Sequence, residues 1–193
     1  MKNILRGIGV GVAGLAFTSG VLAGPVVPAV AHDVAAPDTV AVAQVRAGPD
    51  RAKLATSVTG EQARIDLSAE QQANVKAIVE ATKAQGMNER AAVIAVATAM
   101  QESKLENLGH LGAANDHDSQ GLFQQRPSSG WGTVEQIRDP QYSTKAFLES
   151  LEDVQGWESM ELTDAAQKVQ VSAYPDAYAK WEAQAADLVA QHW

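Results

Sequence analysis

From Ser68 onward, the chain of 193 residues is predicted to fold into an all-α domain. Three observations predict this fold class: helix caps recur along the sequence, apolar residues between the caps follow a helical period, and no useful stretch alternates as a half-buried strand would. The four Trp and three Tyr residues all lie in the second half of the chain. We therefore expect the folded domain over 68–193, a length that can bury a core without disulfide bonds.

The first two helices of this domain have clear beginnings. Ser68 opens a capping box, and Gly86 suits the position just past the end of the helix that follows. Asn88 caps the next helix. Residues 91–97 are apolar on every side of that helix, so we expect it to lie buried at the centre of the domain and to end around 102–105.

A loop and further helices are expected after this central helix. Gly, Asn, Asp and Ser residues between 108 and 120 are typical of a loop. Caps and helix-initiating prolines then predict helices that begin at Thr133, Asp139, Thr163 and Pro175. We expect the helix after Asp139 to end at Gly156, and the helix after Thr163 to run through Val171. The side chains expected to point inward from the later helices are Tyr142, Phe147, Leu151, Val154, Tyr178, Trp181 and Leu188.

The first residues are typical of a secretory signal peptide, which we assign to 1–31. Lys2 and Arg6 provide a basic start, an uncharged and mostly apolar stretch follows, and Ala-Val-Ala at 29–31 suits a signal peptidase. Cleavage after Ala23 and an uncleaved membrane anchor are alternatives. Cleavage is favoured over an anchor because the stretch is short for a membrane span and rich in Gly.

The segment 32–67 is expected to be a linker. It is rich in Ala, Val, Pro, Asp and Thr without a clean period, and Pro37 and Pro49 interrupt any helix. Together with the signal peptide, this organisation predicts a protein that is secreted or held in the cell wall. No stable membrane insertion is expected after the signal is removed.

Composition excludes several classes of function. Cysteine is absent, so the chain has no disulfide, thiolate nucleophile or Cys-ligated metal. The formal net charge is −8, which argues against nucleic acid as a partner because little is available to neutralise phosphates. A bound polymer is therefore expected to be held by hydrogen bonds and stacking. The sequence indicates no cofactor and names no protein partner.

Glu102 is the first candidate for chemistry. It follows the apolar run of the central helix, where burial at the rim of the core can keep a carboxyl protonated at neutral pH, as a general acid for glycosidic bond cleavage requires. The alternative is a solvated Glu at a helix end. The turn at 121–125 favours the catalytic interpretation, because Gln124 and Gln125 offer amides for sugar hydroxyls and Trp131 offers an aromatic face.

A second polar cluster contains His110, Asp116, His117 and Asp118. A calcium-loop pattern starts at Asp116 but fails where the bidentate Glu is required, because Pro127 stands there. The helical zinc pattern is also missing. We therefore interpret this cluster as an Asx-rich turn and expect no metal. Asp116 or Asp118 remains a candidate for a second carboxylate opposite Glu102.

Two motifs at a characteristic spacing carry a family resemblance. Glu102-Ser103 ends the central helix, and Gly121-Leu122-Phe123-Gln124 follows after a loop. This pair resembles the signature of the soluble lytic transglycosylases, a family of the lysozyme-like superfamily. The fuller run from Asp116 to Pro127, with Gly130-Trp131-Gly132-Thr133, is similar to a branch in secreted proteins of Gram-positive actinobacteria and their phages. The resemblance covers roughly 88–185.

This resemblance implies a lysozyme-like fold and cleavage of peptidoglycan glycan strands. Glu102 would protonate the bond between N-acetylmuramic acid and N-acetylglucosamine, and would then take the proton of the muramyl C6 hydroxyl to leave a 1,6-anhydro end. The substrate's acetamido group would stabilise the cationic intermediate, so no second carboxylate would be needed. The residues expected around Glu102 to contact substrate are Ser103, Asp118, Gln124, Gln125, Trp131 and Tyr174.

The chain departs from the family pattern at two places. Phe123 replaces the usual Met, and the family's later Tyr-Asn-Ala-Gly segment is absent. Tyr174 stands at about that place and is the residue expected to hold the catalytic Glu102. Three rival functions stay open: a muramidase that uses water with Asp116 or Asp118 as second carboxylate, a cell-wall glycan-binding or structural protein without activity, and a phage-derived or envelope accessory factor.

Overall fold

The computed structural model describes residues 50–193 apart from 59, 173 and 175. The signal peptide expected over 1–31, the first part of the expected linker and Pro175 therefore lie outside the described residues. Within the described part the fold is all-α, as predicted, and the only β pairing there is an isolated bridge between Gln120 and Gln125. No helix in this part is long and apolar enough to cross a membrane.

The first two predicted helices form with the predicted caps. Helix α2 spans Ala69–Ala84, and its capping box joins Ser68 to Gln71 in both directions. Helix α3 spans Glu89–Ser103, with the side chain of Asn88 accepting a bond from the third residue of the helix. Its whole length from 91 to 100 is buried, which confirms the prediction of a central helix.

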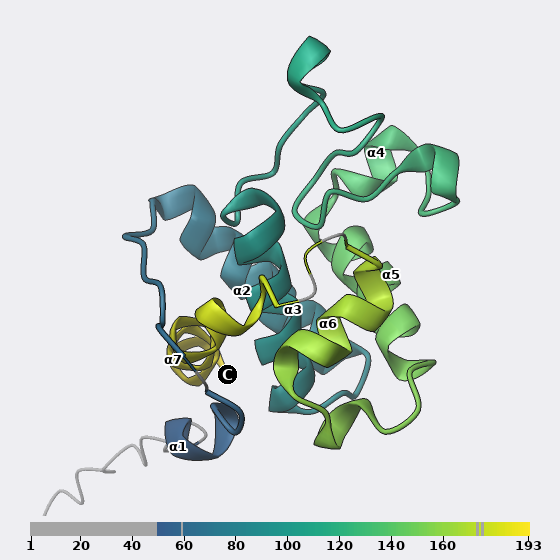
Figure 1. Cartoon of the computed structure of the whole chain (residues 1–193). Coiled ribbons are helices and arrows are strands. Elements are labelled where there is room, and N and C mark those ends of the chain that lie inside the picture. Colours follow the sequence, from purple (N-terminus) through teal and green to yellow (C-terminus); the bar gives the residue numbers. More distant parts are fainter. Residues whose placement is uncertain (1–49, 59, 173, 175) are drawn as a thin grey trace, which may run out of the picture. The chain divides into compact units, whose positions relative to one another are not determined.

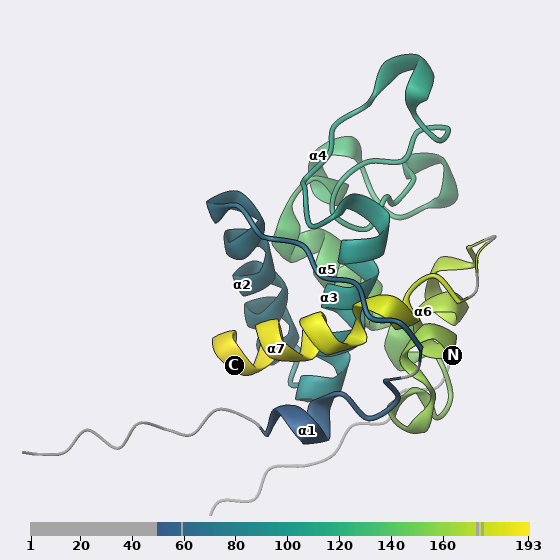
Figure 2. The same ribbon diagram turned by 60° about the vertical axis from the view of Figure 1, so that its left-hand side comes forward.

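Helix α3 lies in the middle of the bundle (Figure 1). It contacts α2, α5 (Pro140–Glu152), α6 (Leu162–Gln170) and α7 (Glu182–His192). Figure 2 shows α7 crossing in front of α3, while the segment from 106 to 139 gathers beyond the end at which α3 finishes. The last turn of α3 therefore emerges from the core directly into a region of loops, which is where a functional side chain becomes reachable.

The loop region is fastened to the bundle through the turn at 121–125. Gly121 has a φ of +77°, and a Cβ added there would lie 2.1 Å from the carbonyl oxygen of Ile137, so the approach of the backbone to helix α4 (Val134–Ile137) requires glycine. Phe123 stacks on Phe147 of α5, with ring centroids 4.8 Å apart. This stacking places Phe123 in the core.

The later helices begin close to, but not always at, the predicted residues. Asp139 caps α5 with Pro140 in the first turn, as predicted, but α5 ends at Glu152 and not at Gly156. Helix α6 begins at Leu162, so Thr163 lies buried inside the helix and is not its cap. The last helix, α7, begins only at Glu182, after a short 3-10 turn.

Several residues between 54 and 67, which we expected to belong to the linker, instead pack on the domain. Leu54, at the end of helix α1 (Arg51–Leu54), is buried in the core. The hydroxyl of Ser57 donates to the carboxylate of Glu182 at 2.8 Å, and Arg90 donates to the same carboxylate at 2.7 Å. The backbone of Ile65 forms two hydrogen bonds with the side-chain amide of Gln184 in α7, one as donor and one as acceptor. The expected domain start at Ser68 is therefore too late.

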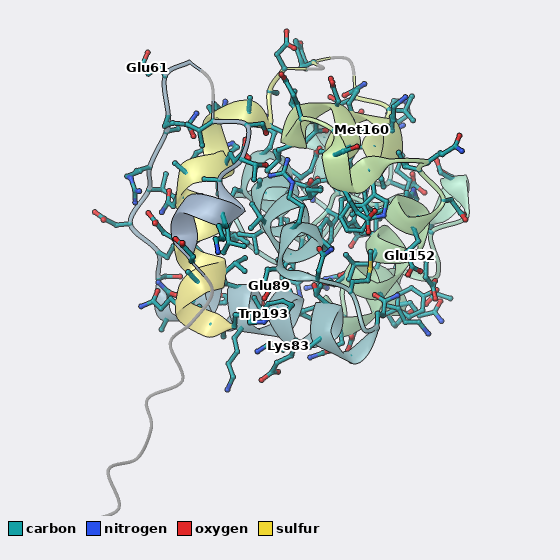
Figure 3. All side chains as sticks on the ribbon, turned by 90° about the horizontal axis from the view of Figure 1, so that it is seen from below. Glu61, Lys83, Glu89, Glu152, Met160 and Trp193 are labelled. Atoms are coloured by element: carbon teal, nitrogen blue, oxygen red, sulfur yellow. The ribbon has the colours of Figure 1, made fainter. Side chains whose placement is uncertain are left out.

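The carboxyl-terminal end of α7 is held against α2 (Figure 3). The ammonium of Lys83 lies 4.9 Å from the ring centroid of Trp193, a cation–π distance. The ring of His192 lies within 3.2 Å of the side-chain oxygen of Gln72. These contacts hold the carboxyl-terminal end of α7 on α2.

Candidate active site

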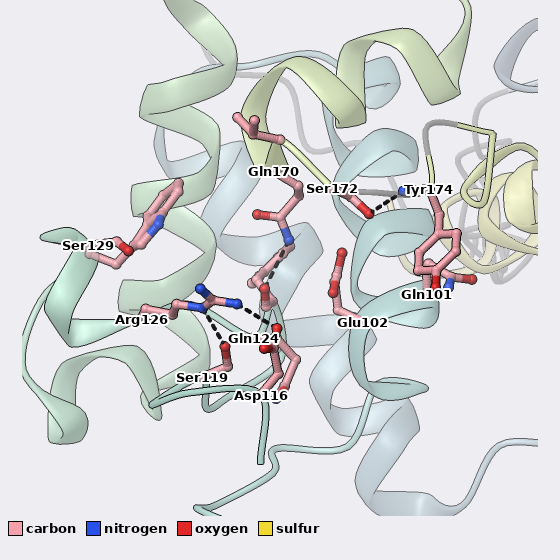
Figure 4. A pocket seen from close by; sticks show the side chains of 13 residues that line it. Gln101, Glu102, Asp116, Ser119, Gln124, Arg126, Ser129, Gln170, Ser172 and Tyr174 are labelled. Atoms are coloured by element: carbon pink, nitrogen blue, oxygen red, sulfur yellow. Dashed lines mark hydrogen bonds and ion pairs between the residues drawn. The ribbon is translucent and has the colours of Figure 1, made fainter. Parts of the chain in front are cut away.

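A pocket of about 590 Å³ opens at the end of α3, and Glu102 lies in its wall (Figure 4). The pocket lies between the last turn of α3, the loop at 116–119, the segment 123–131 and the residues that follow α6. Five of the candidate residues predicted from the sequence line it: Glu102, Asp116, Gln124, Trp131 and Tyr174. The sequence therefore located the pocket, although it did not assign every residue correctly.

The carboxyl of Glu102 is held by Tyr178 and not by Tyr174. The hydroxyl of Tyr178 donates to Oε1 of Glu102 at 2.8 Å, and the ring of Tyr178 is fully buried. Tyr174 is 75% exposed at the edge of the pocket, so the prediction that it holds Glu102 is wrong. The two tyrosines are four residues apart, and the fold brings the later one beneath the end of α3.

Burial is the main influence on the carboxyl of Glu102, and it raises the pKa of this group above its ordinary value. The hydrogen bond from Tyr178 and the nearby amide of Gln170 act in the opposite direction, because both favour the charged form. The charge of Asp116 adds a smaller upward influence on the pKa, and that of Lys104 a smaller downward one. A raised pKa suits a group that must donate a proton near neutral pH.

The opposite side of the pocket carries a charged network around Asp116. Its carboxylate is paired with the guanidinium of Arg126 and with Nδ1 of His117, the latter at 2.7 Å. These two partners hold the pKa of Asp116 below its ordinary value. Arg126 also donates from Nε to the hydroxyl of Ser119 at 3.0 Å. Asp116 is thus a charged group that faces the same pocket as the more weakly acidic Glu102.

Asp118, the other candidate second carboxylate, does not line the pocket. Its two oxygens accept hydrogen bonds from the backbone N–H and the hydroxyl of Ser128, both at 2.8 Å. These bonds lower the pKa of Asp118 and tie the loop to the 3-10 turn at Pro127–Ser129. The expected contact between Asp118 and substrate is therefore corrected to a role in shaping the loop.

Ser103 and Gln125 also stabilise the fold and do not face the pocket. The hydroxyl of Ser103 is buried and donates to the carbonyl of Leu122 at 2.8 Å, so it joins the end of α3 to the turn. Gln125 is buried as well, and its amide donates to the carbonyl of Ser143 in α5 at 3.0 Å. The two motifs that stand out in the sequence thus contact each other, and this contact sets the position of Glu102.

Several pocket residues were not predicted from the sequence, and two of them, Gln101 and Gln170, lie close to Glu102. Gln170 ends α6, and its amide donates to the carbonyl of Phe123 at 2.9 Å while lying near Glu102. Gln101 accepts a bond from the indole of Trp181 at 2.9 Å. The position of Gln101 beside Glu102 was a usable signal, whereas nothing local in the sequence indicates that Gln170 returns to the end of α3.

The described residues contain no group of three or more His, Cys, Asp or Glu side chains placed to hold a metal. The four residues of the polar cluster form hydrogen bonds with protein groups instead. His110 accepts a bond from the backbone of Gly112, whereas Asp116 and His117 bond to each other. These contacts agree with the interpretation of the segment as a polar turn.

No protein-family model matches the chain, and no curated protein matches it either. A function is therefore inferred from the geometry of the pocket and from the residues that line it.

Proposed function

We propose that this protein is a secreted, lysozyme-like enzyme that cleaves the glycan strands of peptidoglycan, with Glu102 as its single general acid and base. The observation that carries the proposal is the state of Glu102: a carboxyl whose pKa is raised by burial, bonded by Tyr178, in the wall of an open polar pocket. The Glu-Ser and Gly-Leu-Phe-Gln motifs, which resemble those of the lytic transglycosylases, contact each other through the buried hydroxyl of Ser103, next to Glu102 in the chain.

The proposed reaction begins with proton transfer from Glu102 to the glycosidic oxygen between N-acetylmuramic acid and N-acetylglucosamine. The C1–O bond breaks, and the substrate's acetamido group stabilises the cationic carbon. The carboxylate left on Glu102 keeps the bond from Tyr178 and is near the amide of Gln170, and both favour its charged form. It then removes the proton of the muramyl C6 hydroxyl, whose oxygen bonds to C1 and closes the 1,6-anhydro ring.

The other pocket residues suit a sugar polymer. Gln101, Gln124 and Gln170 offer amide groups to hydroxyl and acetamido substituents, and Trp131 and Tyr174 offer aromatic rings. The side-chain amide of Gln124 already donates to the carbonyl of Gly121 at 3.0 Å, which orders it in the absence of ligand. Hydrogen bonds from ordered amides cost less conformational entropy on binding.

A water-using muramidase is the second candidate, because Asp116 lines the same pocket as Glu102 and is ionised at neutral pH. In that mechanism Asp116 would activate water or stabilise the cation. Its pairing with Arg126 and His117 favours a structural role instead, since both partners compete for the carboxylate. Asp116→Asn separates the two: nearly full activity supports the transglycosylase, and a loss as large as that of Glu102→Gln supports the muramidase.

Release of soluble fragments from purified peptidoglycan tests the proposed function. Glu102→Gln preserves size and the acceptor for Tyr178 but cannot donate a proton usefully, so turnover should fall by about 10²–10⁴. Glu106→Gln, a change at an exposed Glu shortly after the end of α3, is the matched control and should keep activity. Binding of glycan strands by the wild type with no fragments released would identify the inactive glycan-binding protein.

A further inference from the structure

Two lysine ammonium groups lie over the same tryptophan ring beside the pocket. Nζ of Lys104 is 4.6 Å and Nζ of Lys180 is 5.4 Å from the ring centroid of Trp181. The indole N–H of Trp181 donates to Gln101 at 2.9 Å, and Gln101 lines the pocket next to Glu102. Trp181 therefore connects the two cations to the wall of the pocket.

The backbone at Lys104 is held in an uncommon conformation by dedicated hydrogen bonds. Lys104 and Leu105 have φ values of +56° and +65°, in the left-handed region that non-glycine residues rarely occupy. The buried amide of Gln71 donates to the carbonyl of Lys104 at 2.7 Å, and that of Asn74 donates to the carbonyl of Leu105 at 2.9 Å. Both amides come from α2, so packing of two helices fixes the point from which the Lys104 side chain leaves the backbone.

This pair of cations is not neutralised by a carboxylate bonded to it. Among the residues that the structure describes, neither Lys104 nor Lys180 forms an ion pair, whereas Lys76 and Lys145 each pair with a Glu one turn along their helices. An aromatic ring attracts cations but carries no net charge. Two like charges on one ring repel each other. Burial and then the charge of Lys180 lower the pKa of Lys104, while the nearby charge of Glu102 acts in the opposite direction.

We propose that Lys104 and Lys180 form an anion site for a carboxylate carried by the strand in the pocket. This inference rests on the proposed function, because the carboxylates of a peptidoglycan strand belong to the peptide stems on its muramyl residues. The chain has a formal net charge of −8, so its overall charge repels such groups and a local pair of cations is needed to hold one. Ammonium groups on flexible side chains suit a carboxylate whose position varies, since they act as point charges.

The competing explanation is that the aliphatic parts of the two lysine side chains only cover Trp181, which is 3% exposed. In that case their loss would lower stability without changing the choice of substrate. The test therefore measures selectivity: kcat/KM on glycan strands that carry peptide stems, divided by kcat/KM on the same strands after the stem carboxylates have been converted to amides.

The double variant Lys104→Gln with Lys180→Gln should lower this ratio about 3- to 20-fold, the range expected when two exposed charge contacts are lost. Lys76→Gln with Lys145→Gln removes the same number of charges from other faces and should leave the ratio as in the wild type. Equal losses on both substrates, or no loss on either, would overturn the anion site.

A second readout does not depend on cleavage. The indole N–H signal of Trp181, observed by NMR, should shift when a soluble stem peptide is added to the wild type, and the shift should be absent when its carboxylates are amidated. If the wild type cleaves neither kind of strand, the proposed function fails, and this titration still decides the anion site. No shift with the acidic peptide would overturn it.

Discussion

Tyr178→Phe removes one hydroxyl from the candidate active site and leaves the surrounding packing in place. The ring of Tyr178 is fully buried, so Phe fills the same space, and the change deletes the 2.8 Å bond to Glu102. A hydrogen bond to a charged group contributes about 1.5–3 kcal/mol. The bond stabilises the carboxylate that forms when Glu102 gives up its proton, so its loss should lower kcat about 10- to 100-fold, at about 1.36 kcal/mol per factor of ten.

The pH profile of Tyr178→Phe should shift in a defined direction relative to the wild type. The bond from Tyr178 favours the charged form and lowers the pKa of Glu102, so removing the bond raises this pKa further. In the plot of kcat/KM against pH, the limb that falls with rising pH should therefore move to higher pH. Tyr174→Phe is the matched control, because Glu102 is bonded by Tyr178 and not by the exposed Tyr174, and this change should leave that part of the profile unchanged. A Tyr178→Phe enzyme with the wild-type kcat and the wild-type limb would refute this reasoning.

Three further predictions concern stability. In the folded protein the pKa of Glu102 lies above its ordinary value of 4.5. The stability linked to this group is therefore complete below that value and is lost as pH rises through the folded pKa. The melting temperature of Glu102→Gln should match that of the wild type near pH 4 and exceed it near pH 8. Gly121→Ala places a Cβ 2.1 Å from the carbonyl oxygen of Ile137 and should lower the free energy of unfolding in urea by at least about 3 kcal/mol. Its control is Gly112→Ala, where the added Cβ has open space and only the positive φ is strained, so the loss should be about 1 kcal/mol. Ser103→Ala deletes the buried bond between α3 and the following turn and should cost about 1–3 kcal/mol by the same measurement; an unchanged midpoint would show that this bond does not secure the turn.

Local chemistry explains what the sequence predicted correctly. The caps at Ser68, Asn88 and Asp139 bond within a few residues, so their signals are complete in a short window. The burial of α3 follows from a run that is apolar on every side. The placement of Glu102 at the rim of the core follows from the end of that run.

The errors arose where the answer depended on contacts between distant segments. Residues 54–67 look like a linker by composition, but Ser57 and Arg90 share the buried carboxylate of Glu182, more than a hundred residues from Ser57 in the chain. The choice between Tyr174 and Tyr178 depends on where the chain turns between α6 and α7, and no local pattern specifies that turn. Polar residues of the motifs were expected to face substrate, although the structure uses several of them to connect loops.

The identity of the reaction products tests the central claim most directly. Purified peptidoglycan digested by the wild type should yield muramyl ends that are lighter than reducing ends by one water in mass spectrometry, as expected for 1,6-anhydro ends. Digestion with Glu102→Gln should yield none, while Glu106→Gln should yield the wild-type products. Anhydro ends produced by Glu102→Gln at the wild-type rate, or no cleavage products from the wild type, would contradict the assignment of Glu102 as the catalytic acid and base.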